Sequence, residues 1–402
     1  MNNVYPQVRL GDVCEYYTGR ISAKLLDKKT YISTENMLSE KGGITVSSGL
    51  PTIAITPEYK KDNILLSNIR PYFKKIWFAT QNGGCSNDVL VLKAKNNYFP
   101  KFLYYVLADD KFFDYSTATS KGTKMPRGDK AAIMQYSVPD IPYEEQRIIS
   151  STLSCLDDKI ELNNRINANL EAQAKAIFKS WFVDFEPFQN GEFVESELGK
   201  IPKGWRVGTI VDCCDTIKNG GTPLREKALF WNNATIPWLT SGEVRKSIII
   251  ETEHFISELG LENSSAKWIQ EGSTVIALYG ATAGQVSFLA IPTTTNQAVC
   301  SIIPKENNTY FNYLTMLNRI NQMENMAIGS AQQNISKGIV ENIPVIIPQE
   351  SVLKVFDTLC KSLFQISINN LIESRTLAAI RDILLPRLMS GEIEVPKEEN
   401  QK

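Results

Sequence analysis

Residues 144–184 read EEQRIISSTLSCLDDKIELNNRINANLEAQAKAIFKSWFVD, a stretch without glycine or proline that decides the fold of the chain. Its apolar residues recur alternately four and three positions apart. In chain order they are Ile149, Leu153, Leu156, Ile160, Leu170, Ala174, Ile177 and Trp181. Because this spacing repeats about every 3.5 residues, it predicts the seam of a coiled coil rather than the face of an ordinary surface helix.

A second stretch, residues 349–385, has the same pattern. Its apolar positions are Phe356, Leu359, Leu363, Ile366, Leu377, Ile380 and Leu384. At about 1.5 Å per residue, each helix is expected to be roughly 55–60 Å long. Helices of this length seldom stand alone, so we expect the two to pair with each other.

Asparagines interrupt the middle of both seams. They are Asn163, Asn164 and Asn167 in the first helix and Asn369 and Asn370 in the second. Buried asparagine fixes the register of paired helices at some cost in stability. The alternative is that these residues face solvent in a locally loose coil, and both interpretations stay open at the level of sequence.

The first helix ends in a group of aromatic residues. Five of the eleven residues from 178 to 188 are aromatic: Phe178, Trp181, Phe182, Phe185 and Phe188. This is more than one seam can bury, so the surplus predicts a docking surface for a partner. The alternative is a hydrophobic plug beneath the globular region that follows.

The sequence also repeats itself, which indicates an internal duplication. Arg9-Leu10-Gly11 recurs as Arg206-Val207-Gly208, and Ile160–Asn164 recurs as Ile366–Asn370. The offset drifts between about 197 and 210 residues, as small loop insertions would produce. The repeating unit is therefore one globular module followed by one long helix.

The globular modules are expected to be mixed α/β. Short apolar segments, mostly rich in β-branched residues and bounded by Gly, Asn and Pro, predict strands, and helical periodicity follows them at residues 98–113 and 310–326. The predicted domains are a first module at 1–144, a first long helix at 145–185, a second module at 186–348, a second long helix at 349–395 and a tail at 396–402.

Composition narrows the classes of function. A hydrophobic fraction of 43% and a charged fraction of 22% are typical of a soluble globular protein, and the apolar runs are far too short to cross a membrane. The first ten residues lack the apolar core of a signal peptide. Seven scattered cysteines without a Cys-x-x-Cys pair favour a reducing, cytoplasmic setting.

Catalytic signatures are missing from the sequence. His254 is the single histidine, so neither histidine-based catalysis nor a histidine-rich metal site is expected. The sequence contains no P-loop, no Gly-x-Gly-x-x-Gly and no Asn-Pro-Pro-aromatic motif. These absences favour a recognition module over an enzyme.

The net charge of −1 argues against nucleic-acid binding, but the charge is unevenly distributed, and local basic patches are still compatible with it. Basic residues outnumber acidic ones in residues 1–145, and they gather in two runs. These runs are Lys60, Lys61, Arg70, Lys74 and Lys75, and then Lys121, Lys124, Arg127 and Lys130. Phosphate contacts act within about 10 Å, so a local basic patch matters more than the sum. The alternative is a solvated charged face.

Three motifs make the chain resemble the specificity subunit of type I restriction–modification systems. Phe178–Pro187, FKSWFVDFEP, is similar to the central conserved region of that family, and Leu385–Ile393, LPRLMSGEI, is similar to its distal one. Pro139–Gln146 has the pattern Pro-x-x-Pro-x-x-Glu-Gln, from which the second copy departs with Glu350-Ser351. Three further segments also look like that family's target-recognition domains: Gly220–Pro223, Ile236–Trp238 and Gly280–Gly284.

The resemblance implies a non-catalytic protein that reads double-stranded DNA. Each module would read one half of an asymmetric, bipartite target, and the two long helices would form an antiparallel coiled coil that separates the modules. Two modification subunits and two restriction subunits would assemble on it, with S-adenosylmethionine, ATP and Mg²⁺ bound by those partners rather than by this chain. The residues expected to contact partners are Phe178, Trp181, Phe182, Phe185, Leu385 and Leu388.

The expected DNA contacts are basic or polar residues, many of them near glycine-containing loops, because lysine and arginine bind phosphate and Arg, Gln and Asn contact base edges. In the first module they are Arg70, Lys74, Lys75, Lys121, Lys124 and Arg127. In the second module they are Lys218, Thr222, Arg225, Gln332, Gln333, Asn334 and Lys337.

Three other interpretations remain at this level. The nearest alternative is the separate recognition subunit of a related restriction system that cuts DNA on both sides of its site, which would share the modules but have different partners. A coiled-coil scaffold that binds protein rather than DNA, and a methyltransferase in its own right, are the alternatives from other classes. Co-purification, salt-dependent DNA binding and methyl transfer by the isolated chain would distinguish them.

Overall fold

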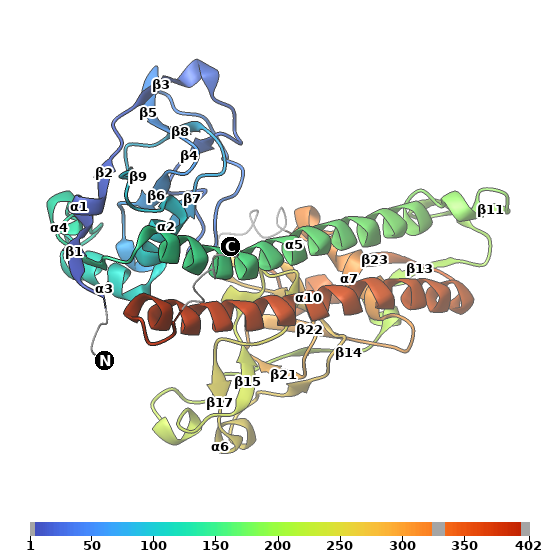
Figure 1. The fold of residues 1–402 in the computed structure, drawn as a ribbon. Helices are drawn as coiled ribbons and strands as arrows, with labels where there is room; N and C mark the ends of the chain where they lie inside the picture. Colours follow the sequence, from blue (N-terminus) through green and yellow to red (C-terminus); the bar gives the residue numbers. More distant parts are fainter. Residues whose placement is uncertain (1–4, 324–333, 395–402) are drawn as a thin grey trace, which may run out of the picture. The chain divides into compact units, whose positions relative to one another are not determined.

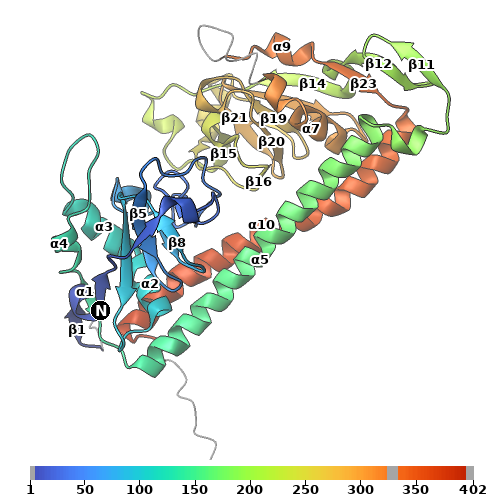
Figure 2. The same cartoon turned by 90° about the horizontal axis from the view of Figure 1, so that it is seen from above.

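The computed structural model describes residues 5–323 and 334–394 (Figures 1 and 2). The predicted tail at 396–402 lies outside the described residues. The chain divides into two compact units, one made of the residues up to Ile160 together with those from Thr376 onward, and the other of Glu161–Arg375. This division runs through both long helices, whereas the predicted domain boundaries treat each helix as a separate segment and stay a prediction.

The first unit contains two four-stranded sheets. The first sheet has the order β2-β9-β6-β7, and its strands are β2 (Cys14–Tyr16), β6 (Ile64–Ser67), β7 (Ile76–Phe78) and β9 (Val89–Ala94). The second has the order β3-β5-β8-β4, and its strands are β3 (Arg20–Ser22), β4 (Tyr31–Ile32), β5 (Ile55–Tyr59) and β8 (Gly83–Cys85). A separate pair is formed by β1 (Gln7–Arg9) and β10 (Ser137–Pro139).

Side chains alternate between two cores in this unit, because successive residues of a strand face opposite sides of the sheet. Ile64 and Leu66 face a core that includes Leu103 and Phe112, whereas Leu65 and Val91 face the core shared with the second sheet. The helices of this unit are α1 (Leu10–Val13), α2 (Pro100–Ala108), α3 (Asp110–Ala118) and α4 (Lys130–Ile133).

The second unit repeats this arrangement with more strands. Its larger sheet has the order β14-β22-β19-β20-β16, with β14 (Cys214–Asn219), β16 (Ile248–Ile249), β19 (Thr274–Ala277), β20 (Val286–Leu289) and β22 (Val299–Pro304). Its smaller sheet has the order β17-β15-β21-β18, with β15 (Ile236–Leu239), β17 (Phe255–Ile256), β18 (Trp268–Ile269) and β21 (Thr293–Thr295). The remaining elements are β11 (Phe193–Ser196), β12 (Gly199–Pro202), β13 (Arg206–Thr209), α6 (Glu258–Glu262), α7 (Thr309–Leu317), α9 (Lys337–Glu341) and β23 (Pro344–Ile347).

Strand register confirms the mixed α/β fold and the duplication. Ile64 of β6 lies opposite Leu92 of β9, and Thr274 of β19 lies opposite Ile302 of β22. Each of the two strand pairs continues for four residues in the same antiparallel register. A 3-10 turn follows β6 in the first module, at Pro71–Phe73, and β19 in the second, at Gly280–Thr282.

The long helices are α5 (Tyr143–Phe182) and α10 (Glu350–Ser390). Figures 1 and 2 both show them side by side and antiparallel, and each unit contains contacts that agree. In the first unit the guanidinium of Arg381 donates to Asp157 at 2.7 Å, and Tyr105 donates to the same carboxylate at 2.7 Å. Although burial disfavours the charged guanidinium, this carboxylate holds the pKa of Arg381 above its ordinary value.

The predicted seam is correct in part. Ile149, Leu153 and Ala174 of α5 are buried as expected, but Leu359, Ile366 and Ile380 of α10 are 46%, 47% and 42% exposed. The buried stripe of α10 shares Phe356 with the predicted seam but otherwise follows other positions, Leu353, Cys360, Phe364 and Ser367. Apolar residues occur in both sets of positions, so the three–four spacing alone does not identify the face that packs.

The aromatic group at the end of α5 belongs to the core of the second unit. The ring centroid of Phe182 lies 4.7 Å from that of Phe356, 5.0 Å from that of Phe311 and 5.9 Å from that of Trp205. Phe178 is 6% exposed and Phe182 is 7% exposed, while Trp181 and Phe185 are half-buried and pack against the same cluster.

This burial corrects the expectation of an exposed docking surface. Phe178 and Phe182 are already covered by the chain's own aromatic residues, as the plug interpretation proposes. Leu385 and Leu388 are 5% and 4% exposed, and they pack in the core of the first unit. Seven free cysteines, of which only Cys155 is exposed, lie in the described part of the chain, and no helix there is long and apolar enough to span a membrane.

Replacing Phe182 with alanine should therefore act on stability. We expect F182A to lower the free energy of unfolding by about 3–5 kcal/mol, because a large buried aromatic side chain leaves a cavity. Urea denaturation of F182A and of the exposed control V183A measures the difference. Unchanged stability combined with weaker partner binding would restore the docking interpretation.

Candidate nucleic-acid interface and helix register

Asn163 of α5 is the most completely buried polar residue between the helices. It is 0% exposed, and its Nδ2 donates to Glu373 Oε2 at 2.8 Å, to Ser374 Oγ at 3.2 Å and to the carbonyl of Asn370 at 3.4 Å. All three acceptors belong to α10. An amide buried without these partners would lose its hydration uncompensated, so the register that supplies them is favoured over its neighbours.

A second set of hydrogen bonds lies one turn further along α5. Asn167 Nδ2 donates to the carbonyl of Ser367 at 3.1 Å, and Asn370 Nδ2 donates to Asn167 Oδ1 at 2.9 Å. Partners on α10 move back toward its start as α5 advances, which is the pattern of an antiparallel pair. We call Asn163, Asn167 and Asn370 the asparagine lock. Asn163 is buried and Asn167 and Asn370 are half-buried, whereas Asn164 and Asn369 are exposed, and the register-fixing role of the first three stays a prediction.

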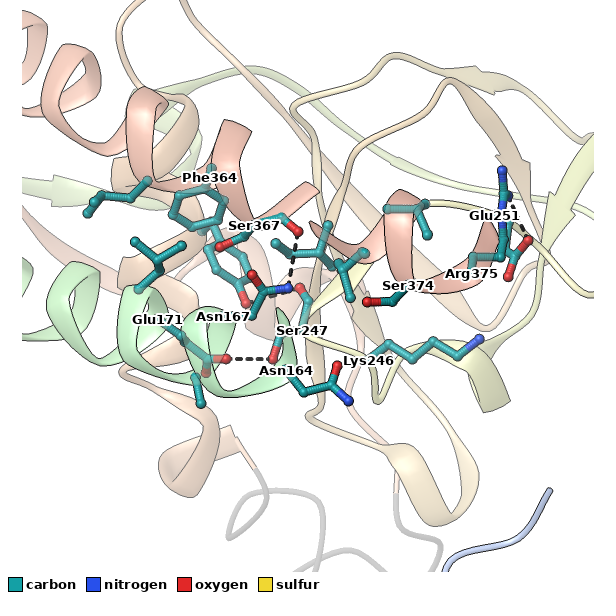
Figure 3. Close-up of a pocket in the computed structure, with 17 residues that line it drawn as sticks. Asn164, Asn167, Glu171, Lys246, Ser247, Glu251, Phe364, Ser367, Ser374 and Arg375 are labelled. Carbon is teal, nitrogen blue, oxygen red and sulfur yellow. Dashed lines mark hydrogen bonds and ion pairs between the residues drawn. The ribbon is translucent and has the colours of Figure 1, made fainter. Parts of the chain in front are cut away.

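A cavity of about 610 Å³ lies beside the lock, between the two helices and the segment Lys246–Glu251 (Figure 3). Two polar contacts lie at its rim. Ser247 donates to Glu171 at 3.0 Å, and Arg375 donates to Glu251 at 2.8 Å. Tyr313, whose hydroxyl donates to the carbonyl of Ser247 at 3.1 Å, lies on its inner wall. These contacts attach the second module to the helix pair around a space that side chains do not fill.

In the first module, the structure brings two of the predicted DNA-contact segments together. Ile69 and Lys121 each form a backbone bridge with Arg127, so the loop that carries Lys121 and Arg127 lies against the turn that begins at Arg70. Both Arg70 and Lys74 have left-handed backbone conformations, with φ of 49° and 50°.

Most of these basic side chains have partners of their own. Lys74 pairs with Asp110 at 3.1 Å, Lys121 with Asp129 at 2.5 Å, and Arg127 with Asp88 at 2.8 Å. The Lys121 ammonium keeps the pKa of Asp129 below its usual value through a hydrogen bond. Phosphate has to compete with these exposed pairs, which cost little to break.

Lys75 and Lys124 differ from the rest. Lys75 donates to the carbonyl of Thr34 at 2.6 Å, and burial lowers its pKa, so it is held inside the module. Lys124 is exposed at the tip of the loop. The structure thus favours Lys121, Lys124 and Arg127 as surface groups and gives Lys75 a structural contact. Arg70 is half-buried, and its Nε is buried without a hydrogen-bond partner among the described residues.

In the second module, the predicted residues fall into two places. Asn334 forms a backbone bridge with Tyr279, which matches the bridge of Arg127 with Ile69, and Lys337 pairs with Glu341 at 3.1 Å. Thr222 and Arg225 lie instead on the turn that follows β14, and Lys218 is exposed on that strand. Gln332 and Gln333 lie outside the described residues.

One contact of this turn was not expected from the sequence. The hydroxyl of Thr222 donates to Oε1 of Gln297, an exposed residue two positions after β21. The available signal was positional, because Gln297 follows a buried Thr-rich strand and aligns with Asn87 in the first module. The described residues contain no cluster of His, Cys, Asp and Glu that could hold a metal ion.

These features define a protein of two related α/β modules that share strand register and differ in the side chains on their loops, with a long antiparallel helix following each module. The family described as "Type I restriction modification DNA specificity domain" matches the sequence twice, at residues 4–172 and 202–374. The chain belongs to this family.

Named relatives agree with this membership. The chain is 32% identical over 322 residues to the type I restriction enzyme MjaIX specificity subunit of Methanocaldococcus jannaschii, covering 79% of this chain and 73% of that protein. It is 27% identical to the HindI specificity subunit of Haemophilus influenzae, covering 97% and 99%. A crystal structure of the type I S subunit from M. genitalium shares the fold, with a TM-score of 0.55 and 16% identity over 98% of each chain.

The asparagine lock predicts a stability difference between neighbouring asparagines. We expect N163A to lower the free energy of unfolding by about 1–3 kcal/mol, because it removes a fully buried amide together with its hydrogen bonds to Glu373, Ser374 and the Asn370 carbonyl. N164A, an exposed neighbour, should change it by less than about 0.5 kcal/mol. Equal effects of the two substitutions in thermal or urea unfolding would show that Asn163 does not fix the pairing.

Proposed function

We propose that this chain is the DNA-recognition subunit of a type I restriction–modification complex, and that each module reads one half of a bipartite target. The observation that carries the proposal is the duplication. One α/β framework with matched strand register occurs twice in a chain of the specificity family, and the exposed loop residues of the two copies differ.

The differences between the modules favour an asymmetric target. At matching positions the first module has Asn87 and the second Gln297, and the turn after β6 carries Arg70 and Pro71 where the turn after β19 carries Gly280 and Ala281. Because base identity is read by side chains at groove edges, different side chains on one framework select different sequences. Two unlike half-sites follow.

The helix pair is proposed to set the spacing between the half-sites. α5 and α10 contain 40 and 41 residues, so each is about 60 Å long. Buried hydrogen bonds of the asparagine lock oppose sliding of one helix past the other. If the helices do not slide, their fixed length sets the number of base pairs between the two half-sites.

The exposed apolar residues of α10 are proposed as the contact surface for modification subunits, in place of the buried aromatic group. Val355, Leu359 and Ile366 are 53%, 46% and 47% exposed and share one face of the helix, since their spacing is close to whole turns. Exposed apolar residues aligned on one face are typical of a protein interface.

The last part of the proposal assigns catalysis to the partner subunits. The chain itself is proposed to be non-catalytic and to act in the cytoplasm, where the modification and restriction subunits supply S-adenosylmethionine, ATP and Mg²⁺. The absence of catalytic motifs in the sequence supports this assignment. The number of each partner subunit, two of each by the resemblance, is part of the proposal.

Lengthening both helices tests the spacing role. Insertion of one heptad after Ile160 and one after Arg375 adds about 10 Å, or about three base pairs of DNA rise. We expect the complex to recognise the same two half-sites separated by a longer spacer, measured by selection from a duplex library with randomised spacers. An unchanged spacer preference would contradict the role of the helices.

Partner binding tests the proposed contact surface. L359K places a charge on the exposed face of α10, so we expect at least tenfold weaker binding of the modification subunit with unchanged thermal stability. Q365K, which adds the same charge at an exposed polar position, is the control. If both variants bind alike, the interface lies elsewhere.

A further inference from the structure

The same place in both modules carries an exposed side-chain amide, and in each module an arginine follows the strand, β2 or β14, that precedes this place in the chain. Backbone hydrogen bonds between matched strands show which residues of the two modules are equivalent. Asn68 donates its backbone N–H to the carbonyl of Asp88 at 2.8 Å, and Leu278 donates to that of Ala298 at 2.8 Å. Asp88 and Ala298 are therefore equivalent, and so are the residues before them, Asn87 and Gln297.

In the second module, the amide of Gln297 is held in position. The hydroxyl of Thr222 donates to its Oε1, which keeps a second lone pair free, and its Nε2 has no hydrogen bond to any residue that the structure describes. Both Thr222 and Gln297 are accessible, the first half-buried and the second exposed. A fixed amide with a free donor and a free acceptor lone pair is suited to a bidentate hydrogen bond.

The turn that carries Thr222 is closely packed and hydrogen-bonded to its neighbours. The N–H of Gly221 donates to the carbonyl of Thr295 at 2.9 Å, and the indole N–H of Trp238 donates to the carbonyl of Gly221 at 3.0 Å. A Cβ on Gly220 would lie 1.9 Å from the Thr295 carbonyl oxygen, so no larger residue fits at this position without displacing backbone. The turn therefore presents its side chains from a fixed backbone.

Arg225 lies on the same turn and is stacked on aromatic rings. Its Cζ is 5.4 Å from the ring centroid of Trp231 and 5.9 Å from that of Trp238. The guanidinium is exposed and forms no ion pair with a residue in the described ranges. Stacking restricts the rotamers of a long side chain, so less entropy is lost when a ligand binds to its donors.

The first module has a counterpart at the equivalent place. A cavity of about 180 Å³ there is lined by Asn87, Arg20, Thr18 and Tyr17, and by Lys130 from α4. Val91 and Ser301 are equivalent by the same strand register. Tyr17 donates its backbone N–H to the carbonyl of Val91, and Lys218 lies opposite Ser301, so Tyr17 and Lys218 are equivalent. The segments that lead from them to Arg20 and to Arg225 therefore begin at the same place in the two modules. Arg20 and Asn87 are exposed and have no hydrogen-bonded or ionic side-chain partner within the described residues.

We infer that this place is the base-reading subsite of each module. Arg225 and Gln297 contact neighbouring base pairs of one half-site through the major groove, and Arg20 and Asn87 contact the other half-site. Arginine fits the O6 and N7 of guanine, and a side-chain amide fits the N6 and N7 of adenine. Thr222 is a positioning residue that acts through Gln297. The inference rests on the proposed function, since it needs the modules to bind duplex DNA.

The test measures sequence preference, position by position, for the full chain assembled with its modification subunits. Substitutions R225A and Q297A should each reduce discrimination about tenfold to hundredfold at one or two base pairs of one half-site. R20A and N87A should do the same only in the other half-site. T222V should weaken discrimination at the base pair read by Gln297, and R225K should not restore the preference lost in R225A, because lysine lacks the planar fork.

Two controls keep the outcomes separate. Gln270 is an exposed glutamine directly after β18 in the same module, and Q270A should leave the recognised motif unchanged. Thermal unfolding identifies any variant that fails to fold, and Q297N then provides a milder change at the same position. A motif unaltered by R225A and Q297A, or an equal loss of affinity for all sequences, overturns the inference. Failure of the unsubstituted complex to select any motif instead overturns the proposed function.

Discussion

The buried amide of Asn163 constrains the rest of the structure, because its three acceptors all lie on the opposite helix. Two long apolar helices can pair in several registers of similar energy, since leucine and isoleucine side chains tolerate sliding. A buried polar group that is satisfied in only one register makes the others costly. Asn167 and Asn370 add hydrogen bonds between the same two helices one turn away.

The α/β framework, the duplication and the two helices could all be predicted from the sequence, because each depends on a pattern spread over many residues. The packing face of α10 could not. Leu359 and Ile366 follow the same regular spacing as the buried Phe356, and only the tertiary contacts show that the packed face continues through Cys360 and Phe364 instead. The aromatic group at the end of α5 was similarly ambiguous, and packing against Phe311, Phe356 and Trp205 makes it core.

Recognition residues were harder to predict than the fold, for a physical reason. A basic side chain in a sequence carries no information about its neighbours, and Lys74, Lys121 and Arg127 turn out to have acidic partners, whereas Lys75 is held by a backbone carbonyl. Thr222 and Arg225 were selected for their chemistry next to a glycine turn. Gln297 was missed because it is distant in sequence from Thr222, to which only the sheet brings it close.

Methylation-sensitive sequencing of a genome modified by the assembled complex tests the central claim most directly. Two unlike modules followed by register-locked helices predict methyladenine within an asymmetric motif, whose two specified parts flank a fixed number of unspecified base pairs. A continuous motif, a palindromic motif or a variable spacer would contradict the account.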